Sequence, residues 1–364
     1  MLVSCLRRVY HVDFRNLITF CKSDVFGLDI GSSSVKAVGL RKDESGYVVT
    51  AAGIAEISLS ATSTGLIHKT GTTRAIRECL AQMPTRSHLA VCSVSGPDVI
   101  VRDFEFQAIP VEEIAGAVEL EASQVCPFNM SEGVVDHHLM TQNDDRLSGT
   151  LVAATNALVQ ERVKAATEAS VECAMVDVDG LALLNCFTEL ERLPAGQTVA
   201  ILNIGRMHTT IAILGPSGQP FVRDMTCAGN QIISRIASDK EMAFSDVAHA
   251  LSGDAGEECA KLRDSLRHAC QDLAEEVNTT YRFYKTQNKD ISLGKMHICG
   301  GFALVEDVVE LLQEQLAVDV ELWNPFDSIP RDARYKRKSE DTTDILKTRG
   351  PAMAVAAGLA LRST

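Results

Sequence analysis

The sequence has few of the residue patterns by which redox, zinc and disulfide-rich proteins are recognised. One of its 364 residues is tryptophan, and 5% are aromatic. Its 11 cysteines include no CxxC pair and no two within four residues of each other, which is typical of reduced cysteines that pack as small core residues. The histidines show no metal-ligand spacing, because the adjacent His137 and His138 would point to opposite faces of a strand. These absences argue against a disulfide framework and against a zinc site.

Three further absences narrow the function. No apolar run reaches about 18 residues, so no membrane-spanning helix is expected. Neither a Walker-type GxxxxGK[ST] loop nor a GxGxxG motif is present, which excludes the two commonest phosphate loops. Positive charge is in deficit, since 35 Lys+Arg against 48 Asp+Glu give a net charge of −13. Such a surface repels phosphate backbones, so we expect no nucleic-acid partner.

Residues 1–23 form an extension with a basic amphipathic pattern. Apolar residues recur there at helical spacing between basic ones, a pattern compatible with an anionic membrane face or with a packed helix. The charges interrupt the apolar run, which argues against a signal peptide. A wrongly assigned start would explain the extension equally well. Its apolar positions are Leu2, Leu6, Val9, Phe14, Leu17, Ile18 and Cys21.

From residue 24 onward, strand-like and helix-like segments alternate, which predicts an α/β fold. We expect one domain over residues 24–197 and a second over residues 198–364, with a helical subdomain at about 231–290. Residues 98–168 change character and predict a small inserted α+β subdomain, whose first helix is stopped by Pro127. The apolar face of the long helix in the second domain consists of Leu262, Leu266, Leu273, Val277 and Tyr284.

Two predicted β-hairpins resemble each other. The segment Asp29–Val38 aligns without gaps on Asn203–Ala212, and each reads as an apolar strand, Ile-Gly, a three-residue turn and a second strand. A glycine after the strand lets the turn approach a ligand closely, and successive N–H groups in such a turn form an anion-binding concavity. The repeat therefore favours a phosphate site, although an ordinary polar turn remains the alternative.

A third element would fit the same ligand. A strand ends at Gly300-Gly301, and we expect one helix to start within a few residues of it. Paired glycines let the backbone lie flat against an adenine or a ribose, and a helix N-terminus favours phosphate. A closing helix is expected from Pro351 near its first turn.

This order of elements resembles the actin-like ATPase superfamily, in which two related α/β domains face each other across a nucleotide. Within it, residues 24–364 are similar to the type IV pilus assembly protein PilM family, relatives of the division protein FtsA. The resemblance implies an actin-like (ribonuclease H-like) two-domain ATPase fold with a small inserted α+β subdomain. The motifs that carry it are FGLDIGSSSVKAVGL, ELEASQVCPFNMSEGVVDHHLM, GNQII, AEEVNTTYRFY, ICGG and WNPF.

The resemblance implies ATP and Mg²⁺ as cofactors, with Asp29 holding the metal through water, and it assigns no catalytic residue. The cofactor-binding positions that match its motifs are Asp29, Gly31, Ser32, Ser33, Ser34 and Lys36 in the first hairpin, Asn203, Gly205, Thr209 and Thr210 in the second, Gly229 and Asn230 in the GNQ segment, and Gly300, Gly301 and Phe302 in the adenosine motif.

One position departs from the family pattern. The second hairpin usually opens with Asp, and here the residue is Asn203. Asparagine keeps the shape and the hydrogen bonding of aspartate but loses the charge that would position a metal ion or a water molecule. We therefore expect at most weak ATPase activity, with ATP acting mainly as a structural ligand.

The implied role is that of a cytoplasmic adaptor, peripheral at the inner face of the bacterial inner membrane, in the pilus machinery of twitching motility. Its implied partners are the N-terminal tail of a PilN-like inner-membrane protein and other pilus inner-membrane components, with self-association left open. The tail would dock in a groove beside the inserted subdomain. Apolar groove candidates, each of which fits a core position better, are Phe104, Phe106, Ile114, Val118 and Phe128.

Other functions remain alternatives. An FtsA-like division adaptor or a type II secretion adaptor would use the same fold. A small-molecule kinase would need a base near the acceptor hydroxyl, and no segment supplies a convincing one. A scaffold that binds no nucleotide would reduce both hairpins to ordinary turns.

Overall fold

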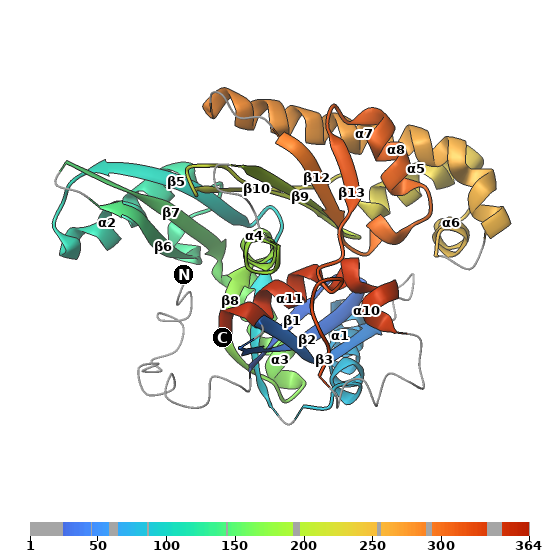
Figure 1. Cartoon of the computed structure of the whole chain (residues 1–364), viewed down its shortest axis with the longest axis horizontal. Helices are drawn as coiled ribbons and strands as arrows, with labels where there is room; N and C mark the ends of the chain where they lie inside the picture. The colour runs from blue at the N-terminus through green and yellow to red at the C-terminus, as the bar shows by residue number, and fades with distance from the viewer. Residues whose placement is uncertain are drawn as a thin grey trace.

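The fold was analysed in a computed structural model, which describes residues 25–44, 46–57, 65–85, 87–142, 145–191, 197–252, 256–288, 293–332 and 344–363. The extension predicted at residues 1–23 lies outside these residues. Figure 1 shows two lobes, with the inserted elements projecting to one side.

The first lobe is built on a five-stranded sheet of order β3-β2-β1-β4-β8. The first three strands form an antiparallel meander, and β4 and β8 continue parallel to β1. Its strands alternate with helices, as predicted. The elements are β1 (Val25–Ile30), β2 (Ser34–Asp43), β3 (Gly46–Glu56), α1 (Gly65–Ala81), β4 (Leu89–Val94), α3 (Asn156–Glu168) and β8 (Glu172–Val178).

The second lobe repeats this topology in a sheet of order β11-β10-β9-β12-β13. Again the first three strands form an antiparallel meander, and β12 and β13 continue parallel to β9. The α/β class is therefore confirmed, and the internal repeat extends from one hairpin to a whole sheet. The strands are β9 (Thr198–Ile204), β10 (Thr209–Leu214), β11 (Pro220–Met225), β12 (Leu293–Cys299) and β13 (Asp319–Leu322).

The inserted elements form a three-stranded antiparallel sheet of order β5-β7-β6. They are β5 (Val99–Gln107), α2 (Val111–Val125), η2 (Met130–Glu132), β6 (Gly133–Gln142) and β7 (Arg146–Thr155). Helix α2 ends just before Pro127, as expected. Of the five apolar groove candidates, Phe104, Ile114 and Val118 are core residues of this sheet and helix, whereas Phe106 and Phe128 are half-buried.

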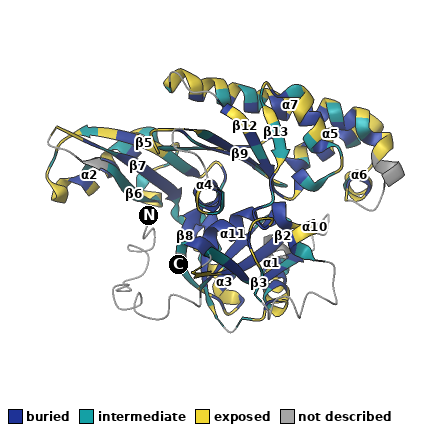
Figure 2. Ribbon diagram, in the orientation of Figure 1, coloured by how far each residue is buried: buried dark blue, intermediate teal, exposed yellow. Residues whose placement is uncertain are grey.

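Two helices lie between the lobes, α4 (Asp179–Leu190) and α11 (Ala354–Ala360). Helix α4 packs on β10, β11 and α11, and α11 packs on β1 and β2. They approach at van der Waals limits, because a Cβ on Gly358 would lie 1.9 Å from the Ala182 carbonyl oxygen. Both helices are buried (Figure 2), so they fix the position of one sheet relative to the other.

Two helices differ from expectation. The closing helix from Pro351 is a 3₁₀ turn, η4 (Gly350–Met353), followed by α11 and by η5 (Leu361–Ser363). The helix expected after Gly301 is split into η3 (Phe302–Leu304) and α8 (Val308–Gln315). The split falls at Asp307, whose φ of 68° lies in the left-handed region and interrupts helical backbone.

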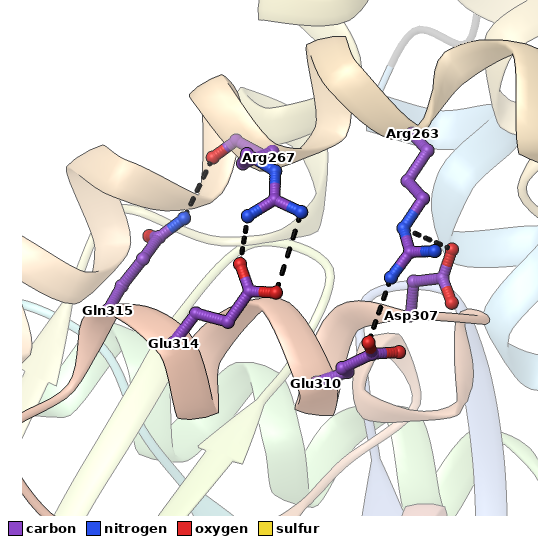
Figure 3. Close-up of polar contacts among 6 residues, drawn as sticks. All are labelled: Arg263, Arg267, Asp307, Glu310, Glu314 and Gln315. Carbon is purple, nitrogen blue, oxygen red and sulfur yellow. Dashed lines mark hydrogen bonds and ion pairs between the residues drawn. The ribbon is translucent and has the colours of Figure 1, made fainter.

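The helices of the second lobe cover one face of its sheet. They include α5 (Gly229–Lys240), α6 (Phe244–Ala250) and α7 (Gly256–Gln287), whereas α10 (Ile345–Thr348) packs on β3 of the first lobe. All five residues predicted for the apolar face of the long helix α7 are buried. Ion pairs then join α7 to α8, Arg263 to Asp307 and Glu310, and Arg267 to Glu314 (Figure 3). These side chains are partly exposed, so each pair contributes little to stability.

Candidate functional site

The first Ile-Gly turn is built around a buried ion pair. Asp29 and Lys36 face each other across the β1–β2 hairpin, with 3.1 Å between the lysine Nζ and the aspartate Oδ2, and each side chain is only 11% exposed. A Cβ on Gly31 would lie 2.9 Å from that Nζ and from the Ser34 carbonyl oxygen, so only glycine fits there. Ser34 is buried, and Ser32 and Ser33 are half-buried.

The second turn repeats this geometry. Asn203 is paired with Thr210, as Asp29 is with Lys36. The Gly31 N–H donates to the Ser34 carbonyl at 3.1 Å, and the Gly205 N–H donates to the His208 carbonyl at 3.0 Å. The gapless alignment of the two hairpins is thus confirmed down to the hydrogen bond that closes each turn.

The side chains of the second hairpin are used differently. Thr209 Oγ1 donates to the Cys227 carbonyl at 2.7 Å, and Thr210 Oγ1 donates to Asp224 Oδ1 at 2.5 Å. Both threonines are buried, so their hydroxyls hold β10 to β11 and its continuation. A phosphate at this turn would be met by backbone N–H groups and not by these two hydroxyl groups.

The remaining predicted residues gather beside the second turn. The Gly229 N–H donates to the Gly205 carbonyl at 3.0 Å, and Arg206 Nε donates to Asn230 Oδ1 at 2.9 Å. These bonds join the turn to the N-terminus of α5. A Cβ on Gly229 would lie 2.6 Å from the Phe302 ring. The GNQ segment and the adenosine motif are therefore neighbours of the second turn.

The Gly-Gly pair lies on the same side. Gly300 has a φ of 100°, and a Cβ there would lie 2.5 Å from Asn203 Oδ1. Gly301 has no atom within 4 Å of the position of a Cβ, so its face is open. A left-handed glycine followed by an open glycine presents bare backbone, which suits the flat face of a base or a ribose.

Two carboxylates that the sequence did not suggest lie between the turns. Asp224 Oδ2 accepts from the Gly96 N–H at 2.7 Å, which links β11 of the second lobe to the end of β4 in the first. Burial raises the pKa of Asp224, and the hydroxyl of Thr210 and the Gly96 N–H oppose that rise. Gly96 has a φ of 107°, and the His208 ring packs where a side chain would be.

Asp179 begins α4 and is affected by both lobes. Burial raises the pKa of its carboxyl to about 7, and the negative charges of Asp29 and Asp224 add to the rise, whereas hydroxyl groups of Ser93 and Ser95 oppose it. Its sequence position was a usable signal, because it directly follows a strand that ends a parallel pair, where ligand sites of α/β proteins gather. Asp224 carried no such signal.

These residues fit a nucleotide with a hydrated Mg²⁺. The turns offer backbone N–H groups, Lys36 offers a cation beside Gly31, and Asp29 offers a carboxylate that could hold the metal through water, as Mg²⁺ prefers. Among the described residues, no three His, Cys, Asp or Glu side chains converge closely enough to bind a metal directly. This set of donors would suit phosphate, with a metal ion held through water.

A separate cavity of about 360 Å³ lies behind the first turn. Its wall combines Ile30 and Gly31 at the end of β1, Thr72 and Thr73 on α1, and one side of α3. The α3 residues that line it are Ala157, Gln160, Glu161, Arg162, Lys164, Ala165 and Glu168. The lining therefore mixes polar and apolar groups, and the cavity joins the first turn to α3, which directly follows the inserted sheet in the chain.

A family model described as "Type IV pilus assembly protein PilM" matches residues 27–364. The chain belongs to the PilM family. In the part of this chain that the structure describes, no helix is both long and apolar enough to cross a bilayer.

Solved structures agree on the fold. A chain of a "PilM-PilN type IV pilus biogenesis complex" matches with a TM-score of 0.79 at 24% identity, covering 94% of this chain and 99% of that one. The ethanolamine utilization protein EutJ from Carboxydothermus hydrogenoformans follows at 0.53, with 13% identity and coverages of 92% and 88%. A diol dehydratase-reactivating factor in nucleotide-free form gives 0.54, with 10% identity and coverages of 93% and 99%. The actin-like fold expected for a PilM relative is confirmed.

Replacing Asp179 with asparagine tests the electrostatics between the turns. A carboxyl whose pKa is about 7 in the folded protein and 3.8 in model compounds binds more protons when folded. The free energy of unfolding therefore falls as pH rises from about 4 to 7. Asp179→Asn removes this loss, and we expect it to be more stable than the parent by about 2–4 kcal/mol at pH 8, with the gain shrinking toward pH 4.

The measurement is urea unfolding of both proteins from pH 4 to 8. Asp177→Asn, two residues earlier, is the matched control. Asp177 pairs with Arg362 at 2.6 Å and is almost wholly buried. The free energy of unfolding of this variant should therefore be about 3–5 kcal/mol lower than that of the parent at pH 8. An Asp179→Asn protein less stable than the parent throughout the range would contradict the account.

Proposed function

We propose that this chain binds Mg·ATP between its two Ile-Gly turns and acts as a cytoplasmic adaptor of a type IV pilus assembly complex. The observation that carries the proposal is the duplicated hairpin, with the same register and the same closing hydrogen bond in both lobes. Membership of the PilM family supports the pilus role. The proposed localisation is the inner face of the bacterial inner membrane, within the machinery of twitching motility.

Most of the predicted binding residues take a specific role in this proposal. Asp29 holds hydrated Mg²⁺, Lys36 meets the β- and γ-phosphates, and the turn N–H groups that follow Gly31 and Gly205 cradle the phosphate oxygens. Gly300, Gly301 and Phe302 meet the adenosine. The hydroxyls of Thr209 and Thr210 support the second turn from behind.

Hydrolysis is proposed to be slow or absent. The second hairpin offers no carboxylate at its first position, and the Asn203 Oδ1 lies against Gly300 and 3.9 Å from the Cys299 sulfur. The Asp29 carboxylate alone would position the metal. Steady multiple-turnover release of phosphate from the pure protein would contradict this part of the proposal.

A small-molecule kinase is the second candidate, favoured by Asp179. A kinase needs a carboxylate near the acceptor hydroxyl, and Asp179, with a pKa of about 7 and both turns nearby, is the residue that would serve. The fold and the family favour the adaptor, because PilM is described as an assembly protein.

The partner in this proposal is the N-terminal tail of a PilN-like inner-membrane protein. The similarity to a PilM chain from a PilM–PilN complex supports that partner. We place the tail in the cavity of about 360 Å³ between α1, α3 and the first turn. An extended segment in a preformed groove is a common mode of peptide recognition. Other pilus inner-membrane components would bind through the complex. Self-association stays a prediction.

Asp29→Asn tests the nucleotide site. The substitution keeps the shape of the side chain but removes the charge that would hold hydrated Mg²⁺ and orient Lys36. Since a hydrogen bond to a charged group is worth about 1.5–3 kcal/mol, we expect the affinity for Mg·ATP to fall about 10- to 100-fold. The measurement is titration with a fluorescent ATP analogue.

The control is Asp43→Asn, which makes the same charge change at the exposed far end of strand β2 and should leave affinity unchanged. If the parent and Asp29→Asn bound the ATP analogue with equal affinity, the first hairpin would not be part of the nucleotide site.

A calorimetric titration with a synthetic PilN-like tail tests the adaptor role. In Mg·ATP we expect saturable binding with one tail per chain. Ala157→Trp adds bulk at an exposed position that lines the cavity and should weaken binding about tenfold or more, because the ligand would lose its space.

The matched control is Leu120→Ala, which removes an exposed apolar side chain from α2 of the inserted subdomain and should have no effect. If Leu120→Ala weakened binding and Ala157→Trp did not, the docking site would lie on the α2 surface. If the nucleotide-loaded protein did not bind the tail, the proposed partner would be wrong.

A further inference from the structure

The tip of the second turn is held by one asparagine. The Asn230 N–H donates to the Arg206 carbonyl at 2.8 Å, and Arg206 Nε donates to Asn230 Oδ1 at 2.9 Å. The side-chain amide nitrogen of Asn230 also lies 2.9 Å from the Met207 sulfur. The main chain and the side chain of Arg206 are thus both fastened to the start of α5, so its guanidinium group has a fixed place beside the turn.

That guanidinium group has no anionic partner. Its other close neighbour is the ring of Phe244, whose centroid lies 6.0 Å from Arg206 Cζ. Among the residues that the structure describes, no carboxylate pairs with Arg206, and its two terminal nitrogens donate to no protein acceptor. Arg206 is half-buried. A guanidinium group fixed by neutral partners only, with its planar fork of donors unused, suits a phosphate.

The first turn of α5 cannot take that role itself. The N–H groups of Gly229 and Asn230 donate to carbonyls of the second phosphate turn. The N–H groups of Gln231 and Ile232 donate to the Ala228 carbonyl. A helix N-terminus binds phosphate through N–H groups that have no partner in the helix, and here a phosphate would find these four donors already used.

The two turns carry their cations at different positions. In the first, the cation is Lys36, in strand β2, and Asp29 compensates it at 3.1 Å. The equivalent pair in the second hairpin is Asn203 and Thr210, neither of which is charged. The cation there is Arg206, within the turn itself. The first pair is therefore neutral overall, whereas the second turn carries one uncompensated positive charge.

We propose that Arg206 binds the phosphate chain of the nucleotide and supplies positive charge that a metal ion would otherwise have to supply. Asn230 is the positioning residue in this arrangement, because it holds the guanidinium group at the turn without neutralising it. This inference rests on the proposed function, since it requires a nucleotide between the two turns. It adds to that function a binding mode in which ATP is held with or without Mg²⁺.

The consequence is a weak dependence of ATP affinity on Mg²⁺. Metal-free ATP carries more negative charge than Mg·ATP, and its Coulomb energy with a fixed cation is larger in proportion. Loss of the cation therefore lowers the affinity for the metal-free form more than the affinity for the metal-bound form. A substitution that only loosened the turn would instead weaken the binding of both forms by the same factor.

The test is a set of titrations of the whole chain with a fluorescent ATP analogue, in Mg²⁺ and in EDTA. In the parent, we expect the affinity in EDTA to lie within about tenfold of that in Mg²⁺. Arg206→Met should weaken binding about tenfold in Mg²⁺ and about 100-fold in EDTA, because it removes charge-assisted hydrogen bonds to phosphate. Arg206→Gln removes the same charge and serves in its place if the methionine variant does not fold.

Two further variants separate charge from shape and position. Arg206→Lys keeps the positive charge without the planar fork, so the ratio of the two affinities should stay close to that of the parent. Arg235→Met is the matched control, because Arg235 lies on α5 and its charge is already paired with Asp272 at 2.7 Å. This control should change neither affinity.

The outcomes keep the inference and the proposed function apart. If the parent binds ATP and Arg206→Met weakens both forms equally, or neither form, the inference is wrong and the proposed function stands. The same holds if the parent binds in Mg²⁺ but not in EDTA. If the parent binds the nucleotide in neither condition, the proposed nucleotide site and the inference are both wrong.

Discussion

The structure depends on one repeated constraint, the hydrogen bond that closes each Ile-Gly turn. Gly31 N–H to the Ser34 carbonyl and Gly205 N–H to the His208 carbonyl fix two turns of equal shape at the ends of two sheets of equal topology. Helices α4 and α11 pack tightly between those sheets and set one turn relative to the other. Loss of either glycine would place a side chain on backbone or on Lys36, so the turns tolerate no other residue.

The two turns share a backbone but differ in charge. The first carries a buried Asp29–Lys36 ion pair, whose two charges are of the signs that a metal ion and a phosphate require. The second carries Asn203 and Thr210, whose side chains face Gly300 and Asp224 within the protein. The first lobe would thus provide the carboxylate that holds the metal ion, and the second lobe would provide backbone donors, the Arg206 cation and the adenosine surface. This division would account for the proposed binding of ATP without rapid hydrolysis.

Sequence reasoning reached the repeat because two hairpins of the same register align without gaps. It did not predict that Asp29 pairs with Lys36 or Asn203 with Thr210 across the hairpins. It could not show that Thr210 is held by Asp224, because that contact joins strands whose pairing no local pattern specifies. The break at Asp307 was missed for a similar reason, since a single left-handed residue leaves the apolar helical pattern intact. Arg162 looked like an ordinary helix residue until α3 was placed beside Ile30.

The central claim is that both turns hold one nucleotide, and amide hydrogen exchange measures it most directly. The account predicts that Mg·ATP slows exchange in the turn segments 31–34 and 205–208 together, and around Gly300 and Gly301, while the exposed face of α2 is unaffected. Protection of one turn alone would contradict joint binding, and protection of neither turn at saturating Mg·ATP would contradict the nucleotide site itself.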